Sequence, residues 1–378
     1  MKRILLTVIF GLTAAFSSAQ DAAQSPVFKG MKAEMDRSIK RLKFEDFTVP
    51  YFLSYSLLDT RDSTLSARYG SLLQEQNYRN RYLYVELRYG SYKMDNSDEG
   101  SRGSSDTAPL DDDEDSLRHR LWLMTDQVYK QAAKDYLQKQ GKKISEVDKD
   151  KLTDFSEAVS TRAFLTADPL SPTLDQYKPL VRTVSARFRN YPEIIDSGIS
   201  LRQSQKVNYY LNTEGTQILQ PSGENPLFLY LWGKTQADDG MNMDVSRTFS
   251  VRNPGKMPSE SDLLKTVDDI AARLKNLRES KLTDPYTGPA ILDSESTAVL
   301  FHEAVGHRLE GERQRDEEEG QTFKGQVGKP IIPEFLSVTD DPTLQQYNGT
   351  DLNGYYRFDE ECVPAQRVAL VDNGILKN

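Results

Sequence analysis

Residues 82–89 read Tyr-Leu-Tyr-Val-Glu-Leu-Arg-Tyr, and their strict alternation is the clearest signal for the fold in this chain. Leu83, Val85 and Leu87 fall on one face of an extended strand, whereas Tyr82 and Tyr84 fall on the other. A strand with one apolar and one more polar face is typical of antiparallel sheets that are covered on one side only. The stretch therefore predicts a half-buried strand in an antiparallel meander.

On either side of this strand, helical and extended patterns follow one another along the chain. Apolar residues recur at helical spacing over 27–42, over 117–132 with an end near Gly141, and over 263–277. The acidic and glycine-containing residues 95–115 predict a solvated loop. Short strands are expected over 194–201, 207–219, 227–232 and 241–251. The fold class is therefore α+β, with an antiparallel sheet in a mixed α/β N-terminal domain.

Turn-forming residues over 284–289, Asp-Pro-Tyr-Thr-Gly-Pro, mark the domain boundary. We predict an N-terminal domain over residues 20–285 and a second domain over 286–378. About one domain per 150 residues agrees with this division.

The first residues have the order of a cleavable secretory signal over 1–19. Lys2 and Arg3 precede an apolar run, Ile4–Phe16, which ends in small residues up to Ala19. We expect export to the periplasm or secretion, with cleavage after Ala19; an uncleaved anchor is the alternative. No second long apolar run follows and the mean hydropathy is −0.63, so no membrane span is expected after cleavage.

Charge and cysteine content narrow the possible partners. The formal net charge is −9 and the pI is near 5.1, so a basic patch that would neutralise nucleic-acid phosphates is not expected. Cys362 is the only cysteine, which excludes an intrachain disulfide. A lone cysteine of this kind is usually an idle thiol; a metal ligand or an intermolecular bond are the alternatives.

The chemistry is concentrated in residues 302–307, His-Glu-Ala-Val-Gly-His. Two of the three histidines flank a glutamate within six residues. Zinc favours neutral imidazole nitrogens, and a neighbouring carboxylate can take a proton from water that the ion has acidified. His302 and His307 are therefore candidate zinc ligands and Glu303 a candidate general base. The alternative is that ordinary hydrogen bonds satisfy both histidines.

The spacing of these histidines needs a local break in regular helix. At about 100° per residue, five positions leave the two rings roughly 140° apart on an ideal α-helix. Either a π-helical turn brings them together, or the helix ends at Gly306. Asp293 or Ser294 is the expected N-cap. An apolar stripe predicts a helix held against a core; its members are Ala298, Phe301, Val305 and Leu309.

The stretch HEAVGHRLEGERQRDEEEGQTFKGQVGKPIIPEFLSVTDDPT, residues 302–343, resembles the metal-binding core of the TldD/PmbA family of metallopeptidases. The resemblance extends to VALVDNGILKN, residues 368–378, and more weakly to VNYYLNTEGTQ, residues 207–217. It implies a mostly β C-terminal domain that carries the metal-binding helix. It also implies zinc bound by His302 and His307 with Glu303 as the catalytic base, cleavage of unfolded or short peptides, and homo- or hetero-oligomers with a family subunit that enclose an internal chamber.

In that family a cysteine further along the chain than Asn378 completes the zinc site. The C-terminal domain is therefore expected to be incomplete here. Three explanations stay open: a fragment, a separate polypeptide that supplies the remaining part, or substitution by Glu310 or Cys362. The leading hypothesis is a zinc-dependent peptidase subunit. The alternatives are a non-catalytic partner that binds peptides or completes an assembly, and a purely structural or storage metal site.

Overall fold

The computed structural model describes residues 23–42, 47–97, 103–145, 153–166, 173–221, 226–281, 283–311, 313 and 320–377. The expected signal peptide, residues 1–19, lies outside this part of the chain. The α-helices are α2 Pro26–Arg41, α3 Glu114–Ser145, α4 Lys178–Arg187, α5 Glu260–Arg278 and α6 Ser294–Phe301. The short helices are η1 Asp175–Tyr177, η2 Phe188–Asn190, η3 Pro254–Lys256, η4 His302–Gly306 and η5 His307–Leu309.

Most strands belong to the N-terminal part of the chain. They are β1 Phe52–Arg68, β2 Ser71–Arg88, β3 Gly90–Ser91, β4 Met94–Asp95, β5 Gly103–Thr107, β6 Arg162–Phe164, β7 Asp196–Asn212, β8 Gln217–Pro221, β9 Leu227–Gln236 and β10 Asn242–Val251. The remaining strands are short: β11 Val338–Asp340, β12 Gln346–Tyr347, β13 Thr350–Asp351, β14 Val368–Asp372 and β15 Ile375–Leu376.

The described residues form two compact units. One contains the chain up to Arg278 together with Phe358–Val363, and the other contains Glu279–Arg357 and Pro364–Asn378. The first holds the large sheet, and the second holds α6, a three-stranded sheet and a small hairpin. The predicted α+β class with an antiparallel sheet is confirmed. The boundaries 20–285 and 286–378 stay predictions.

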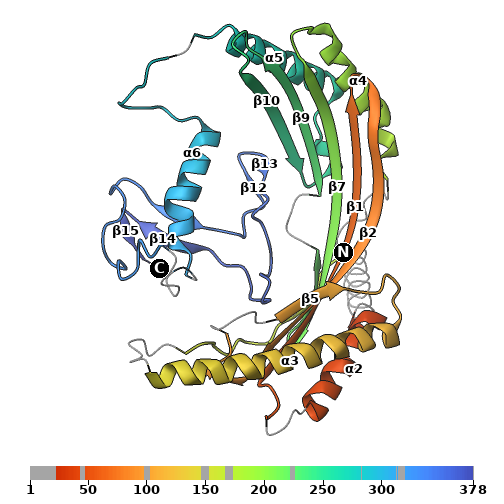
Figure 1. The fold of residues 1–378 in the computed structure, drawn as a ribbon, viewed down its shortest axis with the longest axis vertical. Coiled ribbons are helices and arrows are strands. Elements are labelled where there is room, and N and C mark those ends of the chain that lie inside the picture. Colours follow the sequence, from red (N-terminus) through yellow and green to blue (C-terminus); the bar gives the residue numbers. More distant parts are fainter. Residues whose placement is uncertain are drawn as a thin grey trace, which may run out of the picture. The chain divides into compact units, whose positions relative to one another are not determined.

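The large sheet has the strand order β10-β9-β7-β1-β2-β5, with β8 beside β7 and β6 beside β8 (Figure 1). All of its pairings are antiparallel except that of β6 with β8. Strands β1 and β2 form its long central hairpin, closed by Tyr69 and Gly70, which both have positive φ (47° and 81°). Two residues with positive φ match the twist of the strands they join, so this turn sets the register of the hairpin.

The opening prediction about residues 82–89 is confirmed. Leu83, Val85 and Leu87 are fully buried, whereas Tyr82 and Tyr84 are exposed. The loop predicted over 95–115 is wrong in part, because β5 pairs with β2 there. Backbone hydrogen bonds to an existing strand are available to polar residues too, so composition does not reveal such an edge strand.

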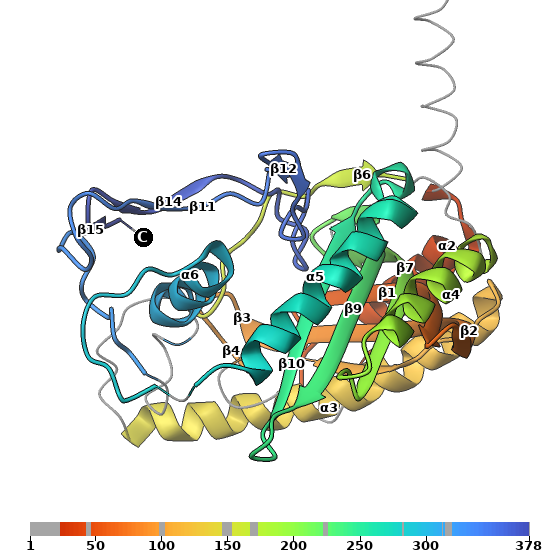
Figure 2. The same ribbon diagram turned by 90° about the horizontal axis from the view of Figure 1, so that it is seen from above.

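One face of the sheet carries the α-helices that the structure describes in this unit, and they lie in two pairs. α2 and α3 cover one end of the sheet, and α4 and α5 cover the other (Figures 1 and 2). The buried residues Leu53, Leu57, Leu65 and Ala67 of β1 are all odd-numbered and therefore share this face. The first two belong to the core under α2 and α3 and the last two to the core under α4 and α5. A single long strand thus contributes to two separate apolar cores.

Strand β7 explains how the two cores come to share one sheet. We predicted separate strands over 194–201 and 207–219, but β7 runs without a break from Asp196 to Asn212. Its central residues are polar, which is why the sequence pattern is interrupted there. In the structure, these residues pair with the equally polar middle of β1, and Gln203 is opposite Ser63. Among the described residues, no helix is long and apolar enough to cross a membrane.

Candidate metal centre

The motif begins on helix α6, whose start the sequence encodes. The side chain of Asp293 is the N-cap and accepts a hydrogen bond from the backbone N–H of Ser296 at 2.8 Å. Glu295 lies in the first turn, where a negative charge is favourable. The predicted capping by Asp293 is confirmed, and it defines the direction in which the following residues are presented.

A π-helical turn then resolves the five-residue spacing. Helix α6 continues into the π-helix η4, in which the backbone N–H of His307 donates to the carbonyl oxygen of His302. Such an i→i+5 bond widens the turn and brings residues five apart onto one side of the helix. Gly306 has φ −54° and ψ −64°, so the backbone stays helical where η4 ends and η5 begins, and of the two alternatives the π-helical turn is the one observed. The wider turn requires no positive φ at this glycine.

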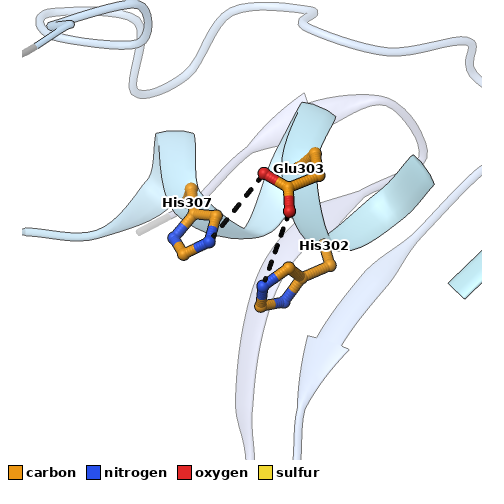
Figure 3. Close-up of side chains that lie close together, drawn as sticks. All are labelled: His302, Glu303 and His307. Atoms are coloured by element: carbon orange, nitrogen blue, oxygen red, sulfur yellow. Dashed lines mark ion pairs between the residues drawn. The ribbon is translucent and has the colours of Figure 1, made fainter. Parts of the chain in front are cut away.

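The turn brings His302, Glu303 and His307 together (Figure 3). The imidazole centroids of His302 and His307 are 4.4 Å apart, with the rings at 68°. Nε2 of each histidine is 4.0 Å from an oxygen of Glu303, and one potential ligand atom from each of the three residues lies within 4.8 Å of the others. Sequence reasoning therefore selected three residues that the fold does bring together.

The donor set and its exposure would allow the group to hold a metal ion such as zinc. Two atoms that bind the same zinc ion at about 2.1 Å each can be at most about 4.2 Å apart. The potential ligand atoms of this group lie within 4.8 Å of one another, so only a small movement of the side chains is needed to bring them within that limit. The side chains of His302 and Glu303 are 64% and 65% exposed, and that of His307 is 34% exposed. Such an adjustment meets little resistance, and water and a substrate have access to the group.

Glu310 contacts the motif without joining it. Its Oε1 is 2.7 Å from Nδ1 of His307, and its Oε2 accepts a hydrogen bond from Nε of Arg313 at 2.6 Å. Arg313 and, to a smaller extent, His307 hold the pKa of Glu310 below its ordinary value. Glu310 is thus a partner of a candidate ligand. Sequence analysis missed Arg313, although the three-residue spacing of His307, Glu310 and Arg313 is a signal that could have revealed it.

The predicted packing of the motif helix against a core is wrong in the described part of the chain. Of the apolar stripe only Val305 is buried, Leu309 is half-buried, and Ala298 and Phe301 are exposed. Helix α6 itself has no buried residue. Helical periodicity identifies residues that share a face, but it does not reveal whether another element covers that face.

Cys362 does not offer a thiolate to a metal. Its side chain is 3% exposed and packs with Tyr210 and Ile218 on the large sheet. Gln220 fixes the same segment by donating to the carbonyl oxygen of Phe358 at 3.1 Å. Burial, reinforced by the nearby carboxylates of Asp359 and Glu360, raises the pKa of the thiol far above its usual range. The environment of Cys362 agrees with the prediction of a thiol that neither binds a metal nor forms a disulfide.

The burial of Cys362 predicts slow chemistry at the thiol. We expect Ellman's reagent at pH 8 to modify the native protein slowly, because both access and the thiolate fraction are small. In urea the modification should be rapid and complete. The absence of a second cysteine makes the absorbance signal unambiguous. Rapid reaction of the native protein would show that the 358–363 segment does not hold the thiol as described.

Comparison with known proteins agrees with the site. Residues 285–378, which include the whole motif, match the family model described as PmbA/TldA metallopeptidase C-terminal domain. A metalloprotease TldD homolog of Buchnera aphidicola is 36% identical over 91 residues, which cover 24% of this chain and 17% of that protein. The C-terminal part of the chain thus carries a domain of the TldD/PmbA family. A metalloprotease of Methanothermobacter thermautotrophicus matches a longer stretch of the chain, at 27% identity over 189 residues.

The fold of the chain is similar to that of a solved TldE structure. The crystal structure of TldE from Thermococcus kodakarensis superposes with a TM-score of 0.57 at 15% identity, over 92% of this chain and 69% of that one. The match to the Methanothermobacter protein covers 48% of this chain and 38% of that protein. The chain thus spans less than half the length of the curated relatives it matches.

Proposed function

We propose that this chain is a zinc-dependent peptidase subunit that hydrolyses peptide bonds. The observation that carries the proposal is the convergence of His302, Glu303 and His307 on one exposed side of a π-helical turn. Two imidazoles and a carboxylate suit zinc better than calcium or magnesium, which prefer oxygen ligands. The match of residues 285–378 to a metallopeptidase domain model supports the same assignment.

Each residue of the group has a separate role in the proposed reaction. His302 and His307 would hold the ion through neutral imidazole nitrogens. When bound, zinc supplies a Lewis acid that polarises a carbonyl and acidifies water to a pKa of about 7. Glu303, 4.0 Å from both imidazoles, would accept the proton of the attacking water and pass it to the leaving amine nitrogen.

The substrate, assembly and location follow from the resemblance and from the N-terminal pattern. Family resemblance supports unfolded or short peptides as substrates and pairing with a copy of this chain or another family subunit. The signal pattern over residues 1–19 supports a periplasmic or secreted protein. These proposals can be tested separately from the chemistry of the site.

A second candidate function is a non-catalytic partner of a family peptidase. It is favoured because no further histidine or cysteine joins the group of His302, Glu303 and His307 in the part of the chain that the structure describes. A catalytic zinc site ordinarily has three protein ligands and an open position. A chain with only two of them would bind peptides or complete another subunit's chamber instead.

The metal content tests the proposed site directly. We expect a single zinc ion per chain, measured by atomic emission on the purified protein alone and after mixing with a family subunit. His302→Ala and His307→Ala should each remove most of the zinc and leave the fold unchanged, because neither side chain is buried. His119→Ala is the matched control, since this third histidine lies on α3 and contacts the ring of Trp122, with the two ring planes at 41°. Absence of zinc from the unmodified protein under both conditions would refute the site.

A further inference from the structure

The two candidate zinc ligands are supported very differently by their surroundings. Nδ1 of His307 lies 2.7 Å from a carboxylate oxygen of Glu310, so this ring is held at the nitrogen that faces away from Glu303. Among the described residues, the ring of His302 forms no hydrogen bond, and its nearest charged neighbour is Glu303 at 4.0 Å. The site therefore has one imidazole that is oriented by a hydrogen bond to a carboxylate and one that is not.

Glu310 is itself held in place. It directly follows the short helix η5 with an extended backbone (φ −60°, ψ 122°), so it stands one turn beyond His307 on the same side. Its second carboxylate oxygen accepts the hydrogen bond from Arg313, whose side chain is 34% exposed. The order His307, Glu310, Arg313 repeats every three residues and forms a short chain of charge-assisted hydrogen bonds.

A carboxylate can only accept, so the shared proton must be on Nδ1 of His307. A neutral imidazole with the proton on Nδ1 has its lone pair on Nε2. Nε2 is the atom that faces Glu303 at 4.0 Å. The hydrogen bond thus selects the one tautomer that can donate electrons to a cation in the group, and it also increases the basicity of the ring.

We propose that Glu310 is the positioning residue of His307, which it holds in the Nδ1-protonated tautomer with Nε2 directed at the metal, and that Arg313 in turn holds Glu310. This inference deepens the proposed zinc site and depends on it for its purpose. It argues against the alternative that Glu310 substitutes as a third ligand, because one oxygen of Glu310 is already engaged by His307 and the other by Arg313.

The tautomer can be observed without metal. We expect ¹⁵N-histidine spectra of the metal-free full chain at pH 8, above the ordinary histidine pKa of about 6.5, to show His307 as the Nδ1-protonated form. Glu310→Ala should convert this resonance to the mixture typical of a free imidazole, and Glu310→Gln, which keeps an acceptor oxygen, should restore it in part. The resonances of His119 and His302 serve as internal references in each spectrum.

Zinc affinity supplies the second measurement. Competition with a chromogenic chelator should show a loss of about 10- to 100-fold for Glu310→Ala, the range for outer-shell partners, and a smaller loss for Arg313→Ala. Glu334→Ala, at an exposed glutamate of the same unit, should bind zinc as the unmodified protein does. The Co²⁺ spectrum should shift for Glu310→Ala and not for Glu334→Ala, which separates a change in ligand geometry from a general loss of structure.

The outcomes distinguish the two proposals. An unmodified protein with His307 protonated on Nε2, or a Glu310→Ala variant with undiminished zinc affinity, overturns the role of Glu310. A protein that binds no zinc but shows the Nδ1-protonated His307, lost in Glu310→Ala, supports the orienting bond and refutes the metal site.

Discussion

Glu303→Gln should lower the rate of peptide hydrolysis by about 10²- to 10⁴-fold, the usual contribution of a general base. The amide has the shape of the carboxylate but cannot accept the proton of the attacking water. The side chain is 65% exposed, so the substitution leaves the fold intact. Zinc content should be unchanged, because His302 and His307 are the proposed ligands. The measurement is kcat/KM on a short unfolded peptide, with the family subunit present.

Glu295→Gln is the matched control for this variant. Glu295 lies on the same helix, in the first turn of α6, and is likewise exposed. Its loss should leave hydrolysis unaffected. If Glu303→Gln retains full activity in the assembly while zinc is still bound, the chain is the non-catalytic partner and the base belongs to another subunit. Loss of both activity and zinc would instead make Glu303 a ligand.

The sequence predicts elements well where burial alternates or recurs regularly. The alternation over 82–89 identified the central hairpin strand, and the helical spacing over 263–277 corresponds to α5, Glu260–Arg278. The sequence predicts an element poorly where that element contributes residues to two separate cores. The middle of β7 is polar because it lies between the two apolar cores, and a pattern that depends on burial treats such a segment as a break.

The site shows a similar division. The five-residue spacing of His302 and His307 required a departure from regular helix, and geometry alone left two possibilities, of which the π-helical turn is the one observed. The role of Glu310 depends on which oxygen points at which nitrogen, and spacing cannot specify that. Cys362 is excluded by its environment on β7 and β8, which are distant from it in sequence. Contacts of this kind require the tertiary structure.

Between the two apolar cores, the sheet carries a belt of polar side chains that includes Asp59, Arg79 and Arg81. We expect this polar belt to contribute strongly to the stability of the protein. Asp59, whose side chain is 10% exposed, accepts hydrogen bonds from Nε of Arg79 at 2.9 Å and from Nε of Arg81 at 2.8 Å. Arg81 is 3% exposed and also donates to Asp112 at 2.6 Å. Asp59→Asn removes the charge that compensates a buried guanidinium, and we expect it to lower the free energy of unfolding by about 3 kcal/mol.

Asp196→Asn is the control on the same sheet. The pair of Arg68 and Asp196 has a similar separation of 3.0 Å, but its side chains are 44% and 36% exposed, so its loss should cost less than about 1 kcal/mol. Urea unfolding followed by tryptophan fluorescence suits both variants, because Trp122 lies on α3 and Trp232 on β9. Equal midpoints for the two variants would contradict the assigned difference.

The carboxylate of Asp59 also makes the stability of the protein depend on pH in a defined direction. Burial alone would raise the pKa of Asp59, but the hydrogen bonds from Arg79 and Arg81 outweigh it and hold the pKa below its ordinary value. A carboxylate with a lowered pKa in the folded state stabilises the protein above the unfolded-state pKa of about 3.9. This contribution is lost as the pH falls below about 4 and through the folded-state pKa. The urea midpoints of the unmodified protein and of Asp59→Asn should therefore converge on acidification, and a constant difference down to pH 2 would show that Asp59 does not titrate as this belt requires.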